Sequence, residues 1–303
     1  RAPSAPSALA LSLDAAAAWF HLGRWAWTFH ETEVQFGKRW SATLAATHSA
    51  PAAATVLAAL RPHPIGQALQ PEFQAWLIGH SQFTEEFFAL LSPLDHLPHV
   101  LRILGELHFR DPARFTRYSR LALALAVVGD VPPPPAWPHR QVAPATLPRQ
   151  LPPAADAFTW WIRQDELGRT AHPLAHSSPA ELKFVIDAAA PFPELEWAQQ
   201  VADFPLAEFA RTVAMVAYRR DRAANENAVW PGRTYRLHEI LAEGGICVDQ
   251  AYFAATAGKA RGVPTLLFHG TGRESRHAWF GFLDGQQTWR LDAGRHAEQG
   301  FVT

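Results

Sequence analysis

A proline-rich segment, VPPPPAWPHRQVAPATLPRQLPP, occupies residues 131–153 and constrains the fold of this chain more than any other feature. Proline cannot donate a backbone hydrogen bond and its ring blocks a helix interior, so neither a helix nor a sheet ladder can run through this segment. We therefore expect an extended linker or a strap along the surface. The predicted division is a helical region over 1–130, a linker over 131–153 and a second domain over 154–303.

The region before the linker reads as helical over residues 8–130. Apolar residues recur at helical spacing in stretches such as DAAAAWFHLGRWAWTF (14–29) and PEFQAWLIGHSQFTEEFFALL (71–91). Another helix is predicted after Asp111, with that residue as the N-cap, Pro112 in the first turn and Gly129 at the end. The Trp, Phe and Leu stripes predict a core between helices, and a groove for a substrate or partner is the alternative.

The region after the linker changes its periodicity part of the way along. Ser178, Pro179 and Glu181 form a capping-box pattern, and helices are predicted over 205–222 and 234–245. From residue 264 the period falls from 3.6 to 2, and PTLLFHG, RHAWFGFL and QQTWRLD read as three strands. The fold class predicted is therefore α+β, with helices followed by an antiparallel sheet.

Composition excludes several classes of protein. The formal net charge is −1 and there is no basic stripe, which argues against nucleic acid as a partner. The longest apolar run, LALALAVV at 121–128, is far shorter than the roughly 20 residues that span a bilayer. A single cysteine excludes an internal disulfide and a cysteine-based zinc site.

That cysteine, Cys247, stands at the predicted start of a helix in GGICVDQAYFAATAGKARGVP (244–264). Small residues recur on one face of this helix (Cys247, Ala251, Ala254, Ala255, Gly258), which would let it lie close against the strands that follow. A thiol at the positive end of a helix is expected to have a lowered pKa, and the thiolate is the reactive form. Asp249, in the first turn, matches the helix dipole and is not expected to be catalytic.

A nucleophilic thiol needs a base and an orienting group, and the strands offer both. If Asp284-Gly285 forms a two-residue hairpin turn, His277 and Asp292 face each other across the two strands. Opposed residues have Cβ atoms roughly 4.5–5.5 Å apart, within reach of an imidazole–carboxylate hydrogen bond. A bulge would shift this register.

These features together resemble the transglutaminase-like domains of the papain-like cysteine protease superfamily. The resemblance rests on GGICVDQAYFAATAGKARGVPT, RHAWFGFLDG and WRLD, and covers roughly residues 234–292. It implies a papain-like core and a triad in which Cys247 attacks an amide carbonyl, His277 transfers the proton and Asp292 orients the imidazole. Such families add a second oxyanion donor, for which Trp230 is our candidate.

The resemblance implies cysteine-dependent hydrolysis or acyl transfer on a peptide or protein substrate, with no cofactor or metal. A peptidase or amidase is expected rather than a crosslinking enzyme, since water is the default acceptor. The resemblance and Arg1 as the first residue together favour an extracytoplasmic location in a bacterium. A catalytically silent module for binding or scaffolding is the alternative, and a structural protein whose helical half docks other chains is a third.

Each candidate residue also has a simpler interpretation. Cys247 could be a small buried apolar residue, His277 a strand histidine, and Asp292 the cap of a turn. His269 competes with His277 as the base but has no opposed carboxylate in any register of the predicted strands. Trp279 is expected to shield the imidazole or line the acyl groove. His96 with His99, and His172 with His176, are spaced for a metal but have no third ligand at a telling distance.

Overall fold

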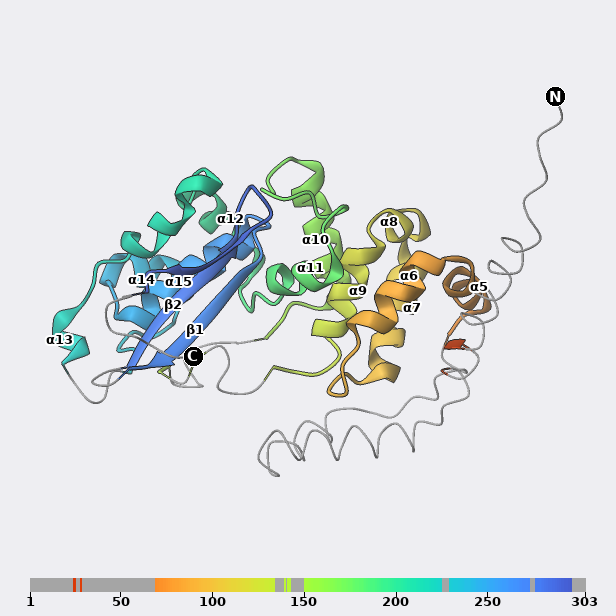
Figure 1. The fold of residues 1–303 in the computed structure, drawn as a ribbon, viewed down its shortest axis with the longest axis horizontal. Coiled ribbons are helices and arrows are strands. Elements are labelled where there is room, and N and C mark those ends of the chain that lie inside the picture. Colours follow the sequence, from red (N-terminus) through yellow and green to blue (C-terminus); the bar gives the residue numbers. More distant parts are fainter. Residues whose placement is uncertain are drawn as a thin grey trace. The chain divides into compact units, whose positions relative to one another are not determined.

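A computed structural model describes residues 69–133, 150–224, 229–272 and 276–295, together with 24, 25, 28, 139, 141 and 142. The chain divides between Val131 and Pro132 into two compact units, each of which is described by itself. The second unit carries the only sheet among the described residues, beside its C-terminal helix α15 (Figure 1). The fold is α+β, as predicted.

The first unit is helical where it is described. Its helices are α5 (Pro71–Gly79), α6 (Ser81–Leu90), α7 (Leu97–Arg110), α8 (Pro112–Arg117) and α9 (Ser119–Val128). Asp111 caps α8 as predicted, since its side chain accepts from the Arg114 backbone N–H at 2.9 Å. Gly129 follows the end of α9, also as predicted. The stretch 14–29 lies almost wholly outside the described residues.

Two helices that the sequence predicts as continuous are broken. The helix over 71–91 ends at Gly79 and restarts at Ser81, with His80 between them in a non-helical conformation. The His80 ring nitrogen Nδ1 lies 2.6 Å from the Trp76 carbonyl oxygen, so a side chain takes a backbone acceptor that the helix would use. The second break falls at Tyr118, between α8 and α9.

Within its described residues, the second unit contains six α-helices before its sheet. They are α10 (Ala154–Glu166), α11 (Pro179–Ile186), α12 (Phe192–Val201), α13 (Arg220–Ala223), α14 (Leu237–Glu243) and α15 (Cys247–Ala260). The predicted capping box of Ser178 and Glu181 is present at α11. Gly244 ends α14 with φ of 71°, a left-handed conformation that favours glycine.

The predicted helix over 205–222 is wrong in its second half. Residues Leu206–Met215 form a 3₁₀ helix, η2, whose buried residues Phe209 and Thr212 follow its three-residue period. The chain is then extended, because Gly245 donates to the Ala217 carbonyl and accepts from the Arg219 N–H, both at 2.8 Å. These contacts with a residue distant in sequence outweigh the local helical pattern.

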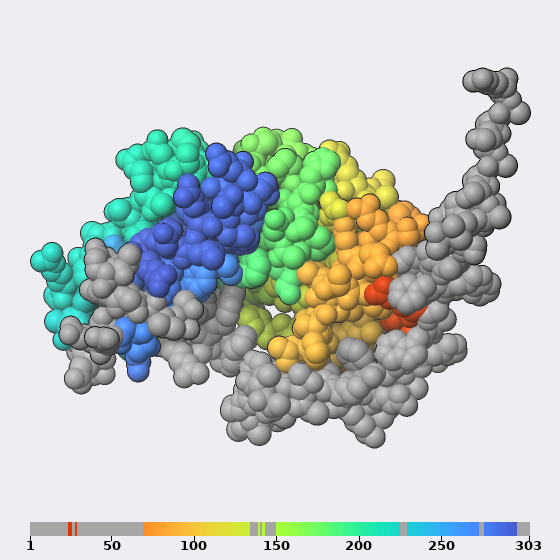
Figure 2. All heavy atoms as spheres, in the orientation of Figure 1, coloured from red at the N-terminus to blue at the C-terminus, as the bar shows by residue number. Residues whose placement is uncertain are grey.

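The sheet follows α15 and contains the three predicted strands. They are β1 (Thr265–Thr271), β2 (Arg276–Leu283) and β3 (Trp289–Ala293), antiparallel in the order β1-β2-β3. Helix α15 packs along β1 and β2 (Figure 1). In Figure 2 the C-terminal strands, in dark blue, form part of the visible surface of this unit, in keeping with the exposure of residues 290–292.

The small residues of α15 permit close packing, as predicted. Ala254 and Ala255 lie in one buried cluster with Phe280 and Phe282 of β2. A Cβ atom added to Gly258 would lie 2.5 Å from the Thr265 side chain and 3.0 Å from Phe209. No larger residue fits at position 258 without displacing β1.

The predicted register between β2 and β3 is wrong. Leu283 pairs with Trp289 rather than with Gln286, and the pairing slips again between Phe280 and Phe282. The loop is longer than two residues because the Asp284 carboxylate accepts from the backbone N–H groups of Gln286 and Thr288, at 2.8 and 3.0 Å. His277 and Asp292 are therefore not opposed.

Candidate active site

A pocket of 580 Å³ opens at the start of α15 and contains the only cysteine. Its walls come from the N-terminal turn of α15, the adjoining ends of β1 and β2, the extended segment before α13, and the segment around residue 141. The residues that line it are His139, Gln141, Tyr218, Ala223, Ile246, Cys247, Val248, His269, Gly270, Thr271, Arg276, His277 and Ala278. A thiol and two predicted candidate bases, His269 and His277, therefore share one pocket.

Cys247 is half-buried at the first position of α15 and is a free thiol. Burial raises the pKa of the Cys247 thiol, and backbone hydrogen bonds from Ala278 and Val248 offset this only in part. The expected lowering of the pKa is therefore wrong, because desolvation outweighs the helix terminus. The thiol is protonated at neutral pH, and catalysis would require a base to remove its proton.

The His277 ring is oriented by a backbone carbonyl. Its Nε2 atom lies 2.7 Å from the carbonyl oxygen of Gly294, in the turn after β3. A carbonyl oxygen can only accept, so Nε2 carries the proton, and in the neutral ring Nδ1 holds the lone pair. The ring also stacks on Trp279, with centroids 6.0 Å apart. Trp279 therefore contacts the imidazole, as expected, and does not line the pocket.

His269 is the second histidine that the sheet contributes to the pocket. It pairs with Ala278 across β1 and β2, and therefore lies on the face of the sheet that packs against α15. Partial desolvation lowers the pKa of His269 even though its side chain keeps an exposed surface. His277, one residue before Ala278, lies on the other face at the strand end.

Asp292 does not take the place that the resemblance implies. Its side chain is exposed and does not line the pocket. Its backbone carbonyl accepts from the Arg295 N–H at 2.9 Å, so Asp292 is the first residue of the turn that ends β3. The Gly294 carbonyl holds the His277 ring instead.

Trp230 is also placed differently. It is 4% exposed, its indole N–H donates to the Thr234 carbonyl at 2.7 Å, and it does not line the pocket. Its ring packs against Tyr235 and lies under the Arg222 guanidinium. With its donor occupied, Trp230 supports the wall behind the pocket rather than an oxyanion.

A buried polar network lies behind the first turn of α15. Asp249, 1% exposed, accepts from the Tyr235 hydroxyl at 2.7 Å, from Arg222 at 3.0 Å and from the Ile246 N–H at 2.8 Å. The Tyr235 hydroxyl oxygen is in turn hydrogen-bonded to Nε2 of His139, 2.9 Å away. Asp249 therefore holds in place the backbone that carries Cys247. This structural role is larger than the match to the helix dipole that the sequence predicts.

Tyr218 and His139 are among the pocket residues that the sequence did not indicate. Tyr218 lies within the predicted helix over 205–222, and His139 lies within the predicted linker. Tyr218 reaches the site only because the chain is extended beside Gly245. The single sequence signal for His139 is a histidine among prolines, which indicates no contact by itself.

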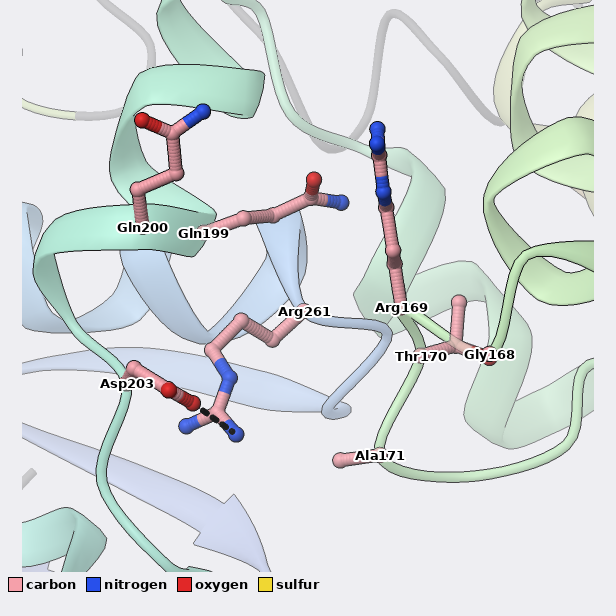
Figure 3. Close-up of a pocket in the computed structure, with 8 residues that line it drawn as sticks. All are labelled: Gly168, Arg169, Thr170, Ala171, Gln199, Gln200, Asp203 and Arg261. Carbon is pink, nitrogen blue, oxygen red and sulfur yellow. Dashed lines mark ion pairs between the residues drawn. The ribbon is translucent and has the colours of Figure 1, made fainter.

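A second pocket, of 520 Å³, lies elsewhere in the same unit (Figure 3). Arg261 is paired there with Asp203 at 3.3 Å, and the Gln199 amide donates to the Ala260 carbonyl at 2.7 Å. Arg169, Thr170 and Gln200 complete its polar lining. Among the described residues that form its walls there is neither a thiol nor a histidine, so it cannot supply the pair that cysteine-dependent acyl transfer requires.

The histidine pairs that suggested a metal have other contacts. His99 Nδ1 lies 2.8 Å from the Asp130 carbonyl oxygen, and His172 lies 3.1 Å from that of Leu283. Over the part of the chain that the structure describes, no three metal-ligating side chains cluster. Within the same ranges, every helix is too short or too polar to span a bilayer.

Comparison of the chain with protein-family models, with curated proteins and with solved structures finds no match. The functional assignment therefore depends on the geometry and chemistry of the pocket.

Proposed function

We propose that residues 154–303 form a cysteine-dependent acyl-transfer domain of the transglutaminase-like type, acting as an amidase or peptidase. One observation supports this most strongly: the only cysteine in the chain lies at a helix N-terminus in the same pocket as His277, whose ring is held by a carbonyl. The α15–sheet packing is consistent with a papain-like core.

Because His277 alternates with Ala278, its ring reaches Cys247 around the end of β2 rather than across the face that packs against α15. In the proposed reaction the neutral thiol of Cys247 gives its proton to Nδ1 of His277 there, as sulfur bonds to the substrate carbonyl carbon. The carbon–nitrogen bond then breaks, and the imidazolium returns the proton to the leaving amine. Water next attacks the thioester and gives a proton to Nδ1. The carbon–sulfur bond breaks, the acid is released, and the thiol regains the proton.

The protein supplies hydrogen-bond donors for the oxyanion and a histidine base. Backbone N–H groups at the start of α15 point toward developing negative charge. The Gly294 carbonyl orients the imidazole as the carboxylate does in a triad, but it has no full negative charge. A dyad of this kind is expected to be slower than a triad, because the carbonyl stabilises the imidazolium less.

p-Nitrophenyl acetate tests the proposal without a known substrate. The wild type should release a burst of nitrophenol, and mass spectrometry should find one acetyl group on Cys247. Cys247→Ala should abolish both, since no other thiol is present. An equal rate of release from the alanine variant would overturn the proposal.

A silent binding module is the second candidate. The raised pKa of Cys247 and the exposed Asp292 favour it, since both weaken the catalytic apparatus. It predicts no acetyl-enzyme, together with a pocket that retains its shape in Cys247→Ala.

A further inference from the structure

The Cys247 pocket has a one-sided charge. Among the described residues that line it there is an arginine, Arg276, and three histidines, but no aspartate or glutamate. The side chain of Arg276 is exposed and makes no ion pair with any described residue. It therefore keeps a full positive charge available to a ligand, because a guanidinium stays protonated at all physiological pH values.

Strand geometry directs Arg276 toward the thiol. Arg276 and Ala278 are two residues apart in β2, so both lie on the face that packs against α15. Cys247 packs against the buried cluster that contains Ala278. Two strand steps separate Arg276 from Ala278, a distance of about 6.6 Å between their Cα atoms.

Among the described residues, the carboxylate whose charge acts on the Cys247 thiol is Asp249. Asp249 is paired with Arg222 at 3.0 Å and does not line the pocket. The first turn of α15 adds the positive end of a helix dipole. Arg220 is exposed and close enough to Tyr218 for its charge to lower the pKa of that phenol.

We propose that the pocket selects acyl donors that carry a carboxylate near the scissile bond, with Arg276 as the residue that determines this specificity. The acyl-transfer step rests on the proposed function, whereas the preference for an anion rests on the lining alone. An acidic side chain or a free C-terminal carboxylate next to the reacting carbonyl has this chemistry.

Alkylation of Cys247 measures the preference without any turnover. Iodoacetate and iodoacetamide share a leaving group and differ in one negative charge. Their rate ratio at Cys247 is divided by the same ratio for a neutral model thiol, N-acetylcysteine amide. We expect a normalised ratio of roughly 3 to 10, the effect of one charge at this range in a partly hydrated site.

Arg276→Gln should bring the ratio to about 1, and Arg276→Glu should bring it below 1. Arg163→Gln is the matched control, since Arg163 is exposed on α10 and does not line the pocket, and it should leave the ratio unchanged. High salt, near 1 M, should lower the wild-type ratio by screening. A wild-type ratio near 1, no effect of Arg276→Gln, or no labelling by either reagent would overturn the inference.

The two sets of measurements separate this inference from the proposed function. A charge-dependent ratio without any acetyl-enzyme would support anion selection and contradict acyl transfer. Acetylation of Cys247 together with a charge-independent ratio would support acyl transfer and contradict anion selection.

Discussion

Nε2 of His277 lies 2.7 Å from the carbonyl oxygen of Gly294, and this contact determines which nitrogen of the ring can act as a base. The acceptor has no proton to give, so the ring must donate from Nε2 and retain its lone pair on Nδ1. The strand end that carries His277 and the turn that carries Gly294 thus define one tautomer before any substrate binds.

Nitrogen-15 NMR of the histidine rings tests this tautomer. When the ring is neutral, the His277 spectrum should show a protonated Nε2 and a bare Nδ1, because the Gly294 carbonyl can only accept. His277→Gln identifies the resonances by their loss. A proton on Nδ1 would contradict the assignment of that atom as the base.

Asp292→Asn should leave acetylation of Cys247 within about fivefold of the wild type, the range expected for an exposed charge without a buried contact. The reason is that the carboxylate neither lines the pocket nor holds His277. The comparison is the burst rate with p-nitrophenyl acetate. A loss of about a hundredfold or more, within the range of a lost catalytic group, would restore Asp292 to the triad.

Local chemistry explains which parts of the fold could be predicted. The capping box at Ser178 and Glu181, the helix start at Cys247 and the three strands depend on neighbouring residues or on periodicity. The candidate site residues Cys247 and His277 are chosen from the same signals. Their common pocket depends on the packing of α15 against the sheet, which its small residues indicate.

Side-chain contacts across the chain explain what could not be predicted. The hairpin register depends on the hydrogen bonds of Asp284 and on Gln287, which has φ of 58° although it is not a glycine. The extended segment after η2 depends on Gly245, about thirty residues later in the chain. Neither contact has a periodic signal in the sequence.

Asp249→Asn should destabilise the second unit by about 3–5 kcal/mol, the cost of leaving a buried arginine without its charge partner. Urea unfolding followed by tryptophan fluorescence measures the change. Asp221→Asn is the control, since that residue pairs with Arg219 at an exposed position and should have no measurable effect. Equal stability of the two variants would show that the network behind Cys247 is not structural.

The raised pKa of Cys247 predicts a specific dependence of stability on pH. Because the folded-state pKa exceeds that of a free thiol, about 8.5, the folded protein holds this proton more tightly than the unfolded chain. The stabilisation is complete below about pH 8 and declines as the pH rises through the folded-state pKa. The slope is at most about 1.4 kcal/mol per pH unit.

This slope can be isolated by comparing the wild type with Cys247→Ala at each pH, because all other groups titrate in both proteins. The unfolding free energy of the wild type minus that of the variant should be constant up to about pH 8 and should fall above it. A wild type that gains stability relative to the variant above this pH would indicate a lowered thiol pKa instead.

In the proposed mechanism Cys247 and His277 act together as nucleophile and base. This pairing is tested by the single-turnover rate of acetyl transfer from p-nitrophenyl acetate to Cys247, followed by mass spectrometry. His277→Gln should lower this rate by about a hundredfold or more, whereas His269→Gln, in the same pocket, should lower it by less than about fivefold. A loss at His269 with none at His277, or no loss in either variant, would contradict the mechanism.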